Sequence, residues 1–244
     1  METLSALGRF RDSRPLLSHH DALRAEADGQ GYLLVSQTIP IEDVLSLRRS
    51  VLEVCGELGW LDHDAPLMDG IAARSVQIGD YRDPLWVELQ RRILPSPEFA
   101  AVAESAQLLG ILEALYAGPV QGGKGSVVRV FSPNSADLTT PAHQDHFYTR
   151  GSEQMWTVWV PLGDCPVELG GLSLIPGSHR HGLLGHEGDN GARGVPGLED
   201  AEWVAGDFAC GDLLMFNCLT VHRALPNFTA NRLRLSVDFR FEPA

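Results

Sequence analysis

The sequence has few cysteines and no long apolar run. Its 244 residues include four cysteines, none of them in a C-x-x-C pair: Cys55, Cys165, Cys210 and Cys218. This spacing argues against a zinc site and a disulfide framework, and it predicts reduced thiols. No stretch reaches the roughly 18 apolar residues of a membrane span, and the N-terminus does not resemble a signal peptide. We therefore expect a cytoplasmic protein with no membrane partner.

Positive charge is also scarce. The chain carries 19 Lys and Arg against 32 Asp and Glu, which gives a formal net charge of -13 at pH 7 and a pI of about 5.0. Nucleic-acid binding requires clustered cations, so this balance excludes nucleic acid as an expected partner. The composition leaves the oligomeric state open.

The first part of the chain, residues 1–125, has the periodicity of helices that support another layer. The clearest apolar face recurs at gaps of three and four residues: Val44, Leu47, Val51, Val54 and Leu58. Ser96 and Pro97 have the residue types of an N-cap and a first helical position, and one helix is predicted from there to Gly118. Tyr32–Val35 is a predicted strand.

The second part, residues 126–244, has short apolar runs between Gly, Pro, Asn and Asp, which is typical of a β-sandwich or jelly roll. The predicted strands are Val127–Phe131, Trp156–Leu162, Leu172–Ile175, Leu213–Phe216 and Leu233–Phe241. Residues 185–200 are rich in Gly and polar side chains, and we interpret them as a long surface loop and a candidate lid. No linker or repeat is present, so we predict one domain, 1–244, mainly β with a helical N-terminal part.

His143-Gln144-Asp145 is an H-x-D pattern among these β signals. In a strand, residues two apart point to the same face, so both side chains can reach one metal ion. The pattern is weak alone, because the chain has nine histidines and His19-His20-Asp21 is a second copy. We reject that copy because it lies at a predicted helix start, where residues two apart do not share a face.

His222 is the third candidate ligand. It follows a turn and the predicted buried strand Leu213–Phe216, so we expect it near a strand end and facing inward. Two histidines and one carboxylate leave three positions of an octahedral ion open, which is the arrangement of non-haem iron(II) oxygenases. Zinc is more often held in a closed tetrahedral set.

A candidate anion clamp lies in the last predicted strand. Arg234 and Ser236 share one face, and a guanidinium with a hydroxyl donor can bind a carboxylate. Arg232 points to the same face and is the alternative. A buried arginine in such a strand requires an anionic partner.

These residues form an ordered series that is similar to one protein family. After His143-Gln144-Asp145 come Gly170-Gly171-Leu172, Pro176-Gly177-Ser178-His179, Gly211-Asp212, His222 and Arg234. The series resembles the phytanoyl-CoA dioxygenase family of iron(II)- and 2-oxoglutarate-dependent oxygenases, over roughly residues 127–241.

The resemblance implies a double-stranded β-helix, a jelly-roll core of the cupin-like kind. It implies that His143, Asp145 and His222 bind Fe(II) and that Arg234, helped by Ser236, binds the far carboxylate of 2-oxoglutarate. Thr157 and Arg129, on two other strands, would be further contacts to the co-substrate or substrate. With O2, such an enzyme hydroxylates an unactivated C–H of a small molecule and converts 2-oxoglutarate to succinate and CO2. The carboxylate of Asp145 favours hydroxylation over halogenation, because related halogenases lack this ligand.

Two other hypotheses remain open at this point. A cupin-like metal enzyme that does not use 2-oxoglutarate would keep the three ligands but would not need Arg234. A non-catalytic jelly-roll binding protein would tolerate the loss of a ligand, and here all three are present. The sequence does not identify the substrate.

Overall fold

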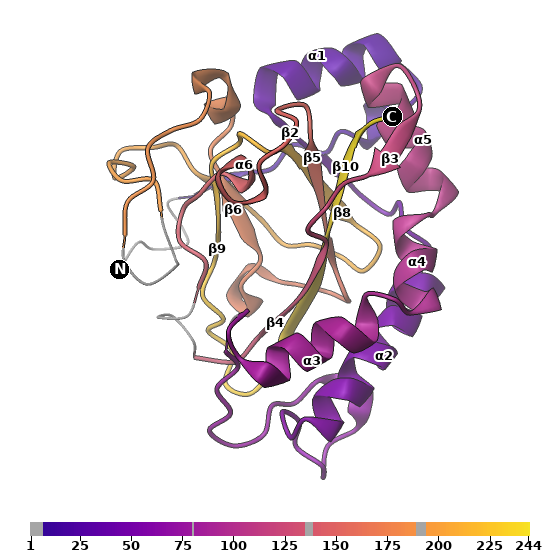
Figure 1. Ribbon diagram of the computed structural model, residues 1–244, viewed down its shortest axis with the longest axis vertical. Coiled ribbons are helices and arrows are strands. Elements are labelled where there is room, and N and C mark those ends of the chain that lie inside the picture. The colour runs from indigo at the N-terminus through magenta and orange to yellow at the C-terminus, as the bar shows by residue number, and fades with distance from the viewer. Residues whose placement is uncertain (1–6, 80, 135–138, 189–193) are drawn as a thin grey trace.

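The computed structural model describes residues 7–79, 81–134, 139–188 and 194–244, and its helices and strands are shown in Figure 1. The α-helices are α1 His20–Gln30, α2 Ile41–Glu57, α3 Pro84–Ile93, α4 Pro97–Ala103, α5 Ala106–Tyr116 and α6 Asp145–Thr149. The short 3-10 turns are Arg14–Leu16, Leu67–Asp69, Val167–Leu169 and Ser178–His181. The strands are β1 Gly8–Arg9, β2 Tyr32–Val35, β3 Val120–Gly122, β4 Val127–Phe131, β5 Trp156–Pro161, β6 Leu172–Leu174, β7 Val204–Ala205, β8 Leu213–Asn217, β9 His222–Ala224 and β10 Arg234–Pro243.

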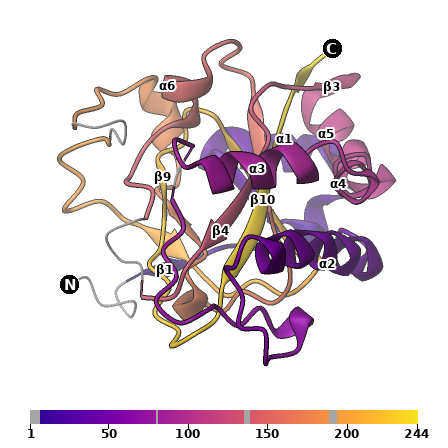
Figure 2. The same cartoon turned by 60° about the horizontal axis from the view of Figure 1, so that its bottom comes forward.

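The strands form two sheets. The larger has the order β2-β8-β5-β10-β3, with β4 also paired to β10, and the smaller has the order β1-β7-β6-β9. Helices α1 to α5 lie along one face of the larger sheet, and the smaller sheet lies on its other side (Figures 1 and 2). This is the predicted jelly roll. Strands β1, β2 and β3 come from the predicted helical part, so that part also extends the sheets.

Successive side chains of a strand point alternately into two buried layers, one between the larger sheet and the helices and one between the two sheets. In β10, Leu235, Val237 and Phe239 join the apolar core that the sheet shares with the helices. Their neighbours Arg234, Ser236, Asp238 and Arg240 are also buried, but they lie on the opposite face, toward the smaller sheet. Trp156 and Trp159 of β5 divide in the same way, as their parity predicts: Trp156 belongs to the helix-side core, and Trp159 to the core between the sheets.

The predicted helix from Ser96 to Gly118 is two helices. Ser96 caps α4 as expected, because its hydroxyl accepts a hydrogen bond from the Phe99 backbone N–H. The chain then leaves the helix at Glu104, and Ser105 caps α5 through the Leu108 N–H. A serine can start a new helix when its hydroxyl accepts a hydrogen bond from the backbone N–H three residues later. The apolar spacing continues across Ser105, so spacing alone did not show the break between the two helices.

Among the described residues, no single helix is long and apolar enough to cross a membrane; only the bent pair α4–α5 passes that test, when its two helices are taken together.

Candidate active site

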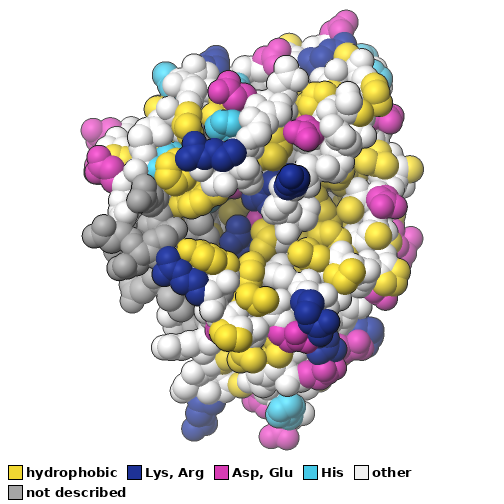
Figure 3. Space-filling model, in the orientation of Figure 1, with side chains coloured by type: hydrophobic (Ala, Val, Ile, Leu, Met, Phe, Trp, Pro, Cys, Tyr) yellow, Lys and Arg dark blue, Asp and Glu magenta, His cyan; other side chains and the backbone are white. Residues whose placement is uncertain are grey.

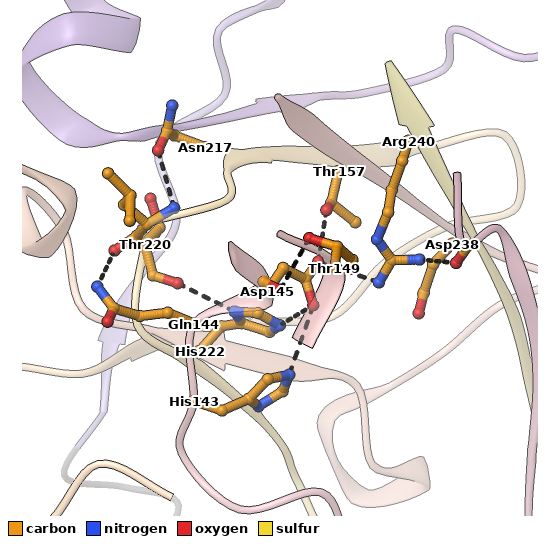
Figure 4. A network of polar contacts seen from close by, with 12 residues as sticks. His143, Gln144, Asp145, Thr149, Thr157, Asn217, Thr220, His222, Asp238 and Arg240 are labelled. Atoms are coloured by element: carbon orange, nitrogen blue, oxygen red, sulfur yellow. Dashed lines mark hydrogen bonds and ion pairs between the residues drawn. The ribbon is translucent and has the colours of Figure 1, made fainter. Parts of the chain in front are cut away.

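Three side chains meet between the two sheets (Figure 4). His143, Asp145 and His222 are all buried, and one ligand atom from each lies within 4.8 Å of the others. The Oδ1 of Asp145 is 3.6 Å from Nε2 of His143 and 3.8 Å from Nε2 of His222. The two imidazole rings lie 4.2 Å apart, centre to centre. Two segments that are far apart in the sequence therefore aim three ligand atoms at one point.

The backbone fixes both histidines. His143 and His222 exchange two backbone hydrogen bonds of 2.8 and 2.9 Å, which places the H-x-D segment beside β9. The Nδ1 of His143 lies 2.8 Å from the carbonyl of Pro141, and the Nδ1 of His222 lies 3.0 Å from that of Thr220. A carbonyl can only accept, so each Nδ1 carries a proton, and Nε2 is the nitrogen of each ring that faces the common centre and can bind a cation.

The expected strand around the H-x-D segment is wrong in detail. Gln144 is extended, with φ -117° and ψ 130°, but Asp145 is the first residue of α6. One extended residue is enough to bring the flanking side chains to the same side. A single bridge to β9 replaces a full strand here, because the chain turns into α6 directly after the pair.

The two carboxylate oxygens of Asp145 have different surroundings. Oδ1 faces the two imidazoles, whereas Oδ2 accepts hydrogen bonds from the Thr157 hydroxyl and from Nη2 of Arg240, the latter at 3.1 Å. Burial by itself would raise the pKa of Asp145, but the Arg240 guanidinium and the two imidazoles hold it well below its usual range. The carboxyl group is therefore ionised, and one oxygen is free to bind a cation.

The donor set fits iron(II). Burial lowers the pKa of His222 to about 3, so this ring is neutral at physiological pH, as a metal ligand must be. Two neutral imidazoles and one carboxylate form the set that non-haem iron sites use, and the backbone carbonyls behind the rings fix their orientation.

A pocket adjoins the ligands and contains the predicted clamp. It is lined by Arg129, Phe131, Thr140, His143, Trp159, Leu172, Phe216, His222, Ala224, Arg234 and Asp238. The face of the molecule drawn in Figure 3 is hollowed near its middle, with basic side chains visible within the hollow and apolar ones along its rim. One pocket, whose exposed wall is mostly apolar, is thus lined by both imidazoles and by Arg234.

Arg234 is a buried cation that lacks an acidic partner among the described residues. It is 1% exposed, its Nη1 donates to the Ser236 hydroxyl at 2.7 Å, and its guanidinium lies over the Phe131 ring at 4.0 Å. Its Nε has no hydrogen-bond partner. Burial lowers the pKa of Arg234 to about 10, so it remains charged at neutral pH. A buried charge of this kind requires an anion from outside the chain.

The other predicted site residues lie nearby. Arg129 lines the pocket and forms an ion pair of 3.1 Å with Asp238. Thr157 is buried behind Asp145 and is absent from the pocket lining, which favours a role in orienting that ligand. Arg232, the alternative clamp, is only partly buried, precedes the first residue of β10 and does not line the pocket.

Several polar residues of the site have no motif of their own in the sequence. Asp238 and Arg240 continue the inward face of β10, and strict alternation after Arg234 and Ser236 was the available signal. Gln144, the extended residue between the two ligands, faces away from the metal centre: its amide N–H groups donate to the carbonyls of Gly182 and Leu219, and its amide oxygen accepts from the N–H of Leu184. No sequence pattern points to these contacts.

His186 lies in a loop and is partly buried, and it contacts the H-x-D segment. Its Nε2 accepts a hydrogen bond from the Gln144 backbone N–H at 3.1 Å, and its ring stacks on Phe147 at 4.1 Å. The N–H of Val195 also bonds to the carbonyl of Ala142. Both described ends of the candidate lid therefore pack against the H-x-D segment, whereas residues 189–193 lie outside the described part of the chain.

The jelly roll, the three converging ligand atoms and the adjoining cationic pocket define a metal-dependent oxygenase. The family model "Phytanoyl-CoA dioxygenase (PhyH)" matches residues 27–235, and the chain belongs to this family. It is therefore a non-haem iron, 2-oxoglutarate-dependent dioxygenase, which confirms the expectation from the resemblance.

Relatives and solved structures agree with this assignment. The 1-deoxypentalenic acid 11-beta-hydroxylases of Streptomyces arenae and Streptomyces exfoliatus are 27% and 28% identical to the chain, over 96% and 98% of it and 85% and 86% of their own lengths. The epimerase SnoN, solved with Fe3+, alpha ketoglutarate and nogalamycin RO, has a TM-score of 0.67 at 22% identity, covering 93% of this chain and 84% of its own. EvdO2 from Micromonospora carbonacea, solved with 2-oxoglutarate, has a TM-score of 0.65 at 21% identity, covering 100% and 94%. The two structural matches show the fold.

Proposed function

We propose that this protein hydroxylates an unactivated C–H of an apolar small molecule, using iron(II), 2-oxoglutarate and O2. The observation that carries the proposal is that one pocket is lined by two of the three ligands and by Arg234, a buried cation with no acidic partner in the part of the chain that the structure describes. A metal centre alone would suit a cupin-like enzyme that does not use 2-oxoglutarate, but such an enzyme has no use for a buried arginine without a partner.

Each residue has a role that follows from its contacts. His143, His222 and Oδ1 of Asp145 would hold the iron, and Arg234 with Ser236 would hold the far carboxylate of 2-oxoglutarate. When bound, iron and 2-oxoglutarate supply the oxidising power for C–H hydroxylation, with decarboxylation to succinate and CO2. The protein orients the reagents and excludes water with the apolar walls that Phe131, Trp159, Leu172 and Phe216 provide.

An apolar substrate is supported by the surroundings of the ligands. Tyr148 is 44% exposed, and its ring meets that of His143 edge-on at 5.6 Å. Leu183, in the segment that Gln144 holds, is 42% exposed. The ring of Tyr148 therefore offers an exposed, mainly apolar surface beside a metal ligand. The two Streptomyces relatives are named for hydroxylation of 1-deoxypentalenic acid, a small molecule, and we propose that the substrate here is also a small molecule whose surface is mainly apolar.

Oxygen-dependent conversion of 2-oxoglutarate to succinate tests the proposal directly. Purified protein with ferrous iron and ascorbate should form succinate slowly alone and faster with an accepted substrate, and a chelator should abolish the reaction. Asp145→Ala should be inactive, whereas Asp21→Ala, in the rejected H-x-D, should keep full activity. No succinate from the folded, iron-loaded wild type would refute the proposal, and unchanged activity in Asp145→Ala would show that the metal site is misplaced.

A further inference from the structure

The oxygen of Asp145 that faces away from the metal centre is held from two directions. Oδ2 accepts one hydrogen bond from the Thr157 hydroxyl and one from the Arg240 guanidinium, and both donor residues are buried (Figure 4). A carboxylate oxygen that accepts two strong donors has little capacity left for a cation. Only Oδ1 faces Nε2 of His143 and His222.

The two donors belong to one cross-strand pair. Arg240 of β10 lies directly opposite Thr157 of β5 in the antiparallel register. Residues opposite one another in such a pair have neighbouring side chains on the same face. The larger sheet therefore presents a hydroxyl and a guanidinium side by side at the carboxylate of α6, and a slip of one residue would remove Arg240 from that face.

Arg240 forms its ion pair with Asp145. Its Nη1 donates to the carbonyl of Gly125, which anchors the guanidinium, and its Nη2 reaches Oδ2. Asp238, its neighbour on the same face, forms its ion pair with Arg129. The inward charges thus fall into two internal pairs, Asp145 with Arg240 and Asp238 with Arg129, and leave Arg234 for an external anion.

We propose that Thr157 and Arg240 are positioning residues that restrict Asp145 to a single ligand oxygen. Three protein atoms then occupy three of the six positions of an octahedral ion, and three positions remain for 2-oxoglutarate and O2. A carboxylate that bound through both oxygens would take one of those three. The inference rests on the proposed metal site but on neither the substrate nor the hydroxylation.

Substitution of Thr157 tests the inference with the smallest change. Thr157→Val keeps the shape and removes the hydroxyl, whereas Thr157→Ser keeps the donor. Manganese(II) binding to the metal-free protein, measured by calorimetry, should weaken roughly 10-fold in Thr157→Val. The affinity should return toward the wild-type value in Thr157→Ser. A role limited to packing predicts the reverse order, because serine loses the methyl group that valine keeps.

Arg240→Leu should weaken manganese(II) binding more, by up to about 100-fold, because it removes both a donor and the compensating charge. Arg48→Leu is the control: it removes a partly buried arginine of α2 that donates to the carbonyls of Leu162 and Met68 and does not line the pocket, and it should leave manganese affinity near the wild-type value. The double variant Thr157→Val/Arg240→Leu should lose less than the product of the single effects, because both residues act on one oxygen.

A second measurement reports the number of open positions. Under nitrogen, binding of 2-oxoglutarate to the iron(II)-loaded protein is followed by the visible absorption of the chelate. Thr157→Val and Arg240→Leu, at saturating iron, should bind 2-oxoglutarate more weakly or with a shifted band, whereas Thr157→Ser and the wild type should agree. Wild-type manganese affinity and an unchanged band in folded Thr157→Val would overturn the inference, even if Arg240→Leu fails to fold. Absence of manganese binding in the wild type would instead refute the metal site itself.

Discussion

The two faces of the larger sheet are built from the same strands but differ in chemistry: one is apolar, and the other carries buried polar and charged side chains. The face toward α1 to α5 is an apolar core, in which Val158 and Val160 of β5 meet Val237 and Phe239 of β10. The face toward the smaller sheet contains Thr157, Asp238 and Arg240 from the same two strands, and each is buried with a charged or hydroxyl partner. We expect the first face to contribute most of the stability and the second to determine reactivity. Because side chains alternate, one β-strand can serve both.

Loss of the carboxylate ligand should have the largest effect on the site face. Asp145→Ala should reduce succinate formation by more than about 100-fold, beyond what the loss of an outer-shell contact costs. It also leaves Arg240 buried without its acid, so the fold should lose some stability. Activity and thermal unfolding of the same preparations check both effects. A variant that unfolds early but keeps normal activity when folded would contradict the division between the faces.

Removal of the unpaired cation should harm co-substrate binding but not the fold. Arg234→Met should raise the KM for 2-oxoglutarate about 100-fold, which is the scale of breaking a buried charge pair by about 3 kcal/mol. Without 2-oxoglutarate its melting temperature should equal or exceed that of the wild type, because an unpaired buried charge is lost. Arg232→Met is the control and should leave the KM nearly unchanged. A large rise in the KM for 2-oxoglutarate in Arg232→Met and none in Arg234→Met would show that Arg232, and not Arg234, binds the far carboxylate.

The helix face should show the converse behaviour. Leu47 of α2 is fully buried, so Leu47→Ala should reduce the free energy of unfolding by about 2–5 kcal/mol. Under conditions where the variant is folded, kcat and the KM for 2-oxoglutarate should match the wild type. Denaturant unfolding and steady-state kinetics measure the two quantities. A change in KM at full folding would show that the apolar layer also shapes the site.

The smallest expected effect is at Gln144, which belongs to the site without touching the metal centre. Gln144→Ala removes its bonds to Gly182, Leu184 and Leu219, and it should cost about 1–3 kcal/mol of stability. Because the segment 182–186 loses its anchor, protease cleavage there should become faster. Gln154→Ala, at an exposed position, should change neither quantity. Equal cleavage of both variants would mean that the segment is held by other contacts.

The fold was predictable wherever a local period was strong. The strands β2 and β4 have the predicted bounds, and the β5 and β8 predictions differ by one residue at an end. The short strands β1, β3, β7 and β9 have two or three residues each, which is too few for a period to be visible. The break between α4 and α5 depended on one serine cap inside a continuous apolar pattern.

The site was predictable where residue chemistry is rare. A buried strand with Arg234 and Ser236, and histidines at spaced positions beside a carboxylate, restrict the choices strongly. Thr157 was expected at the site only through the family resemblance, and neither its contact with Asp145 nor the roles of Arg240 and Gln144 could be predicted, because they depend on the register of β5 with β10 and on a loop that folds back onto the H-x-D segment. Contacts between segments that are far apart in the sequence produce no residue spacing from which they could be predicted.

A crystal structure of the protein loaded with manganese(II) and 2-oxoglutarate under nitrogen tests the central claim most directly. We expect one ion bound by Nε2 of His143, Nε2 of His222 and Oδ1 of Asp145, with the far carboxylate of 2-oxoglutarate on Arg234. An ion bound elsewhere, or a fully loaded metal site with no 2-oxoglutarate at Arg234, would contradict the account.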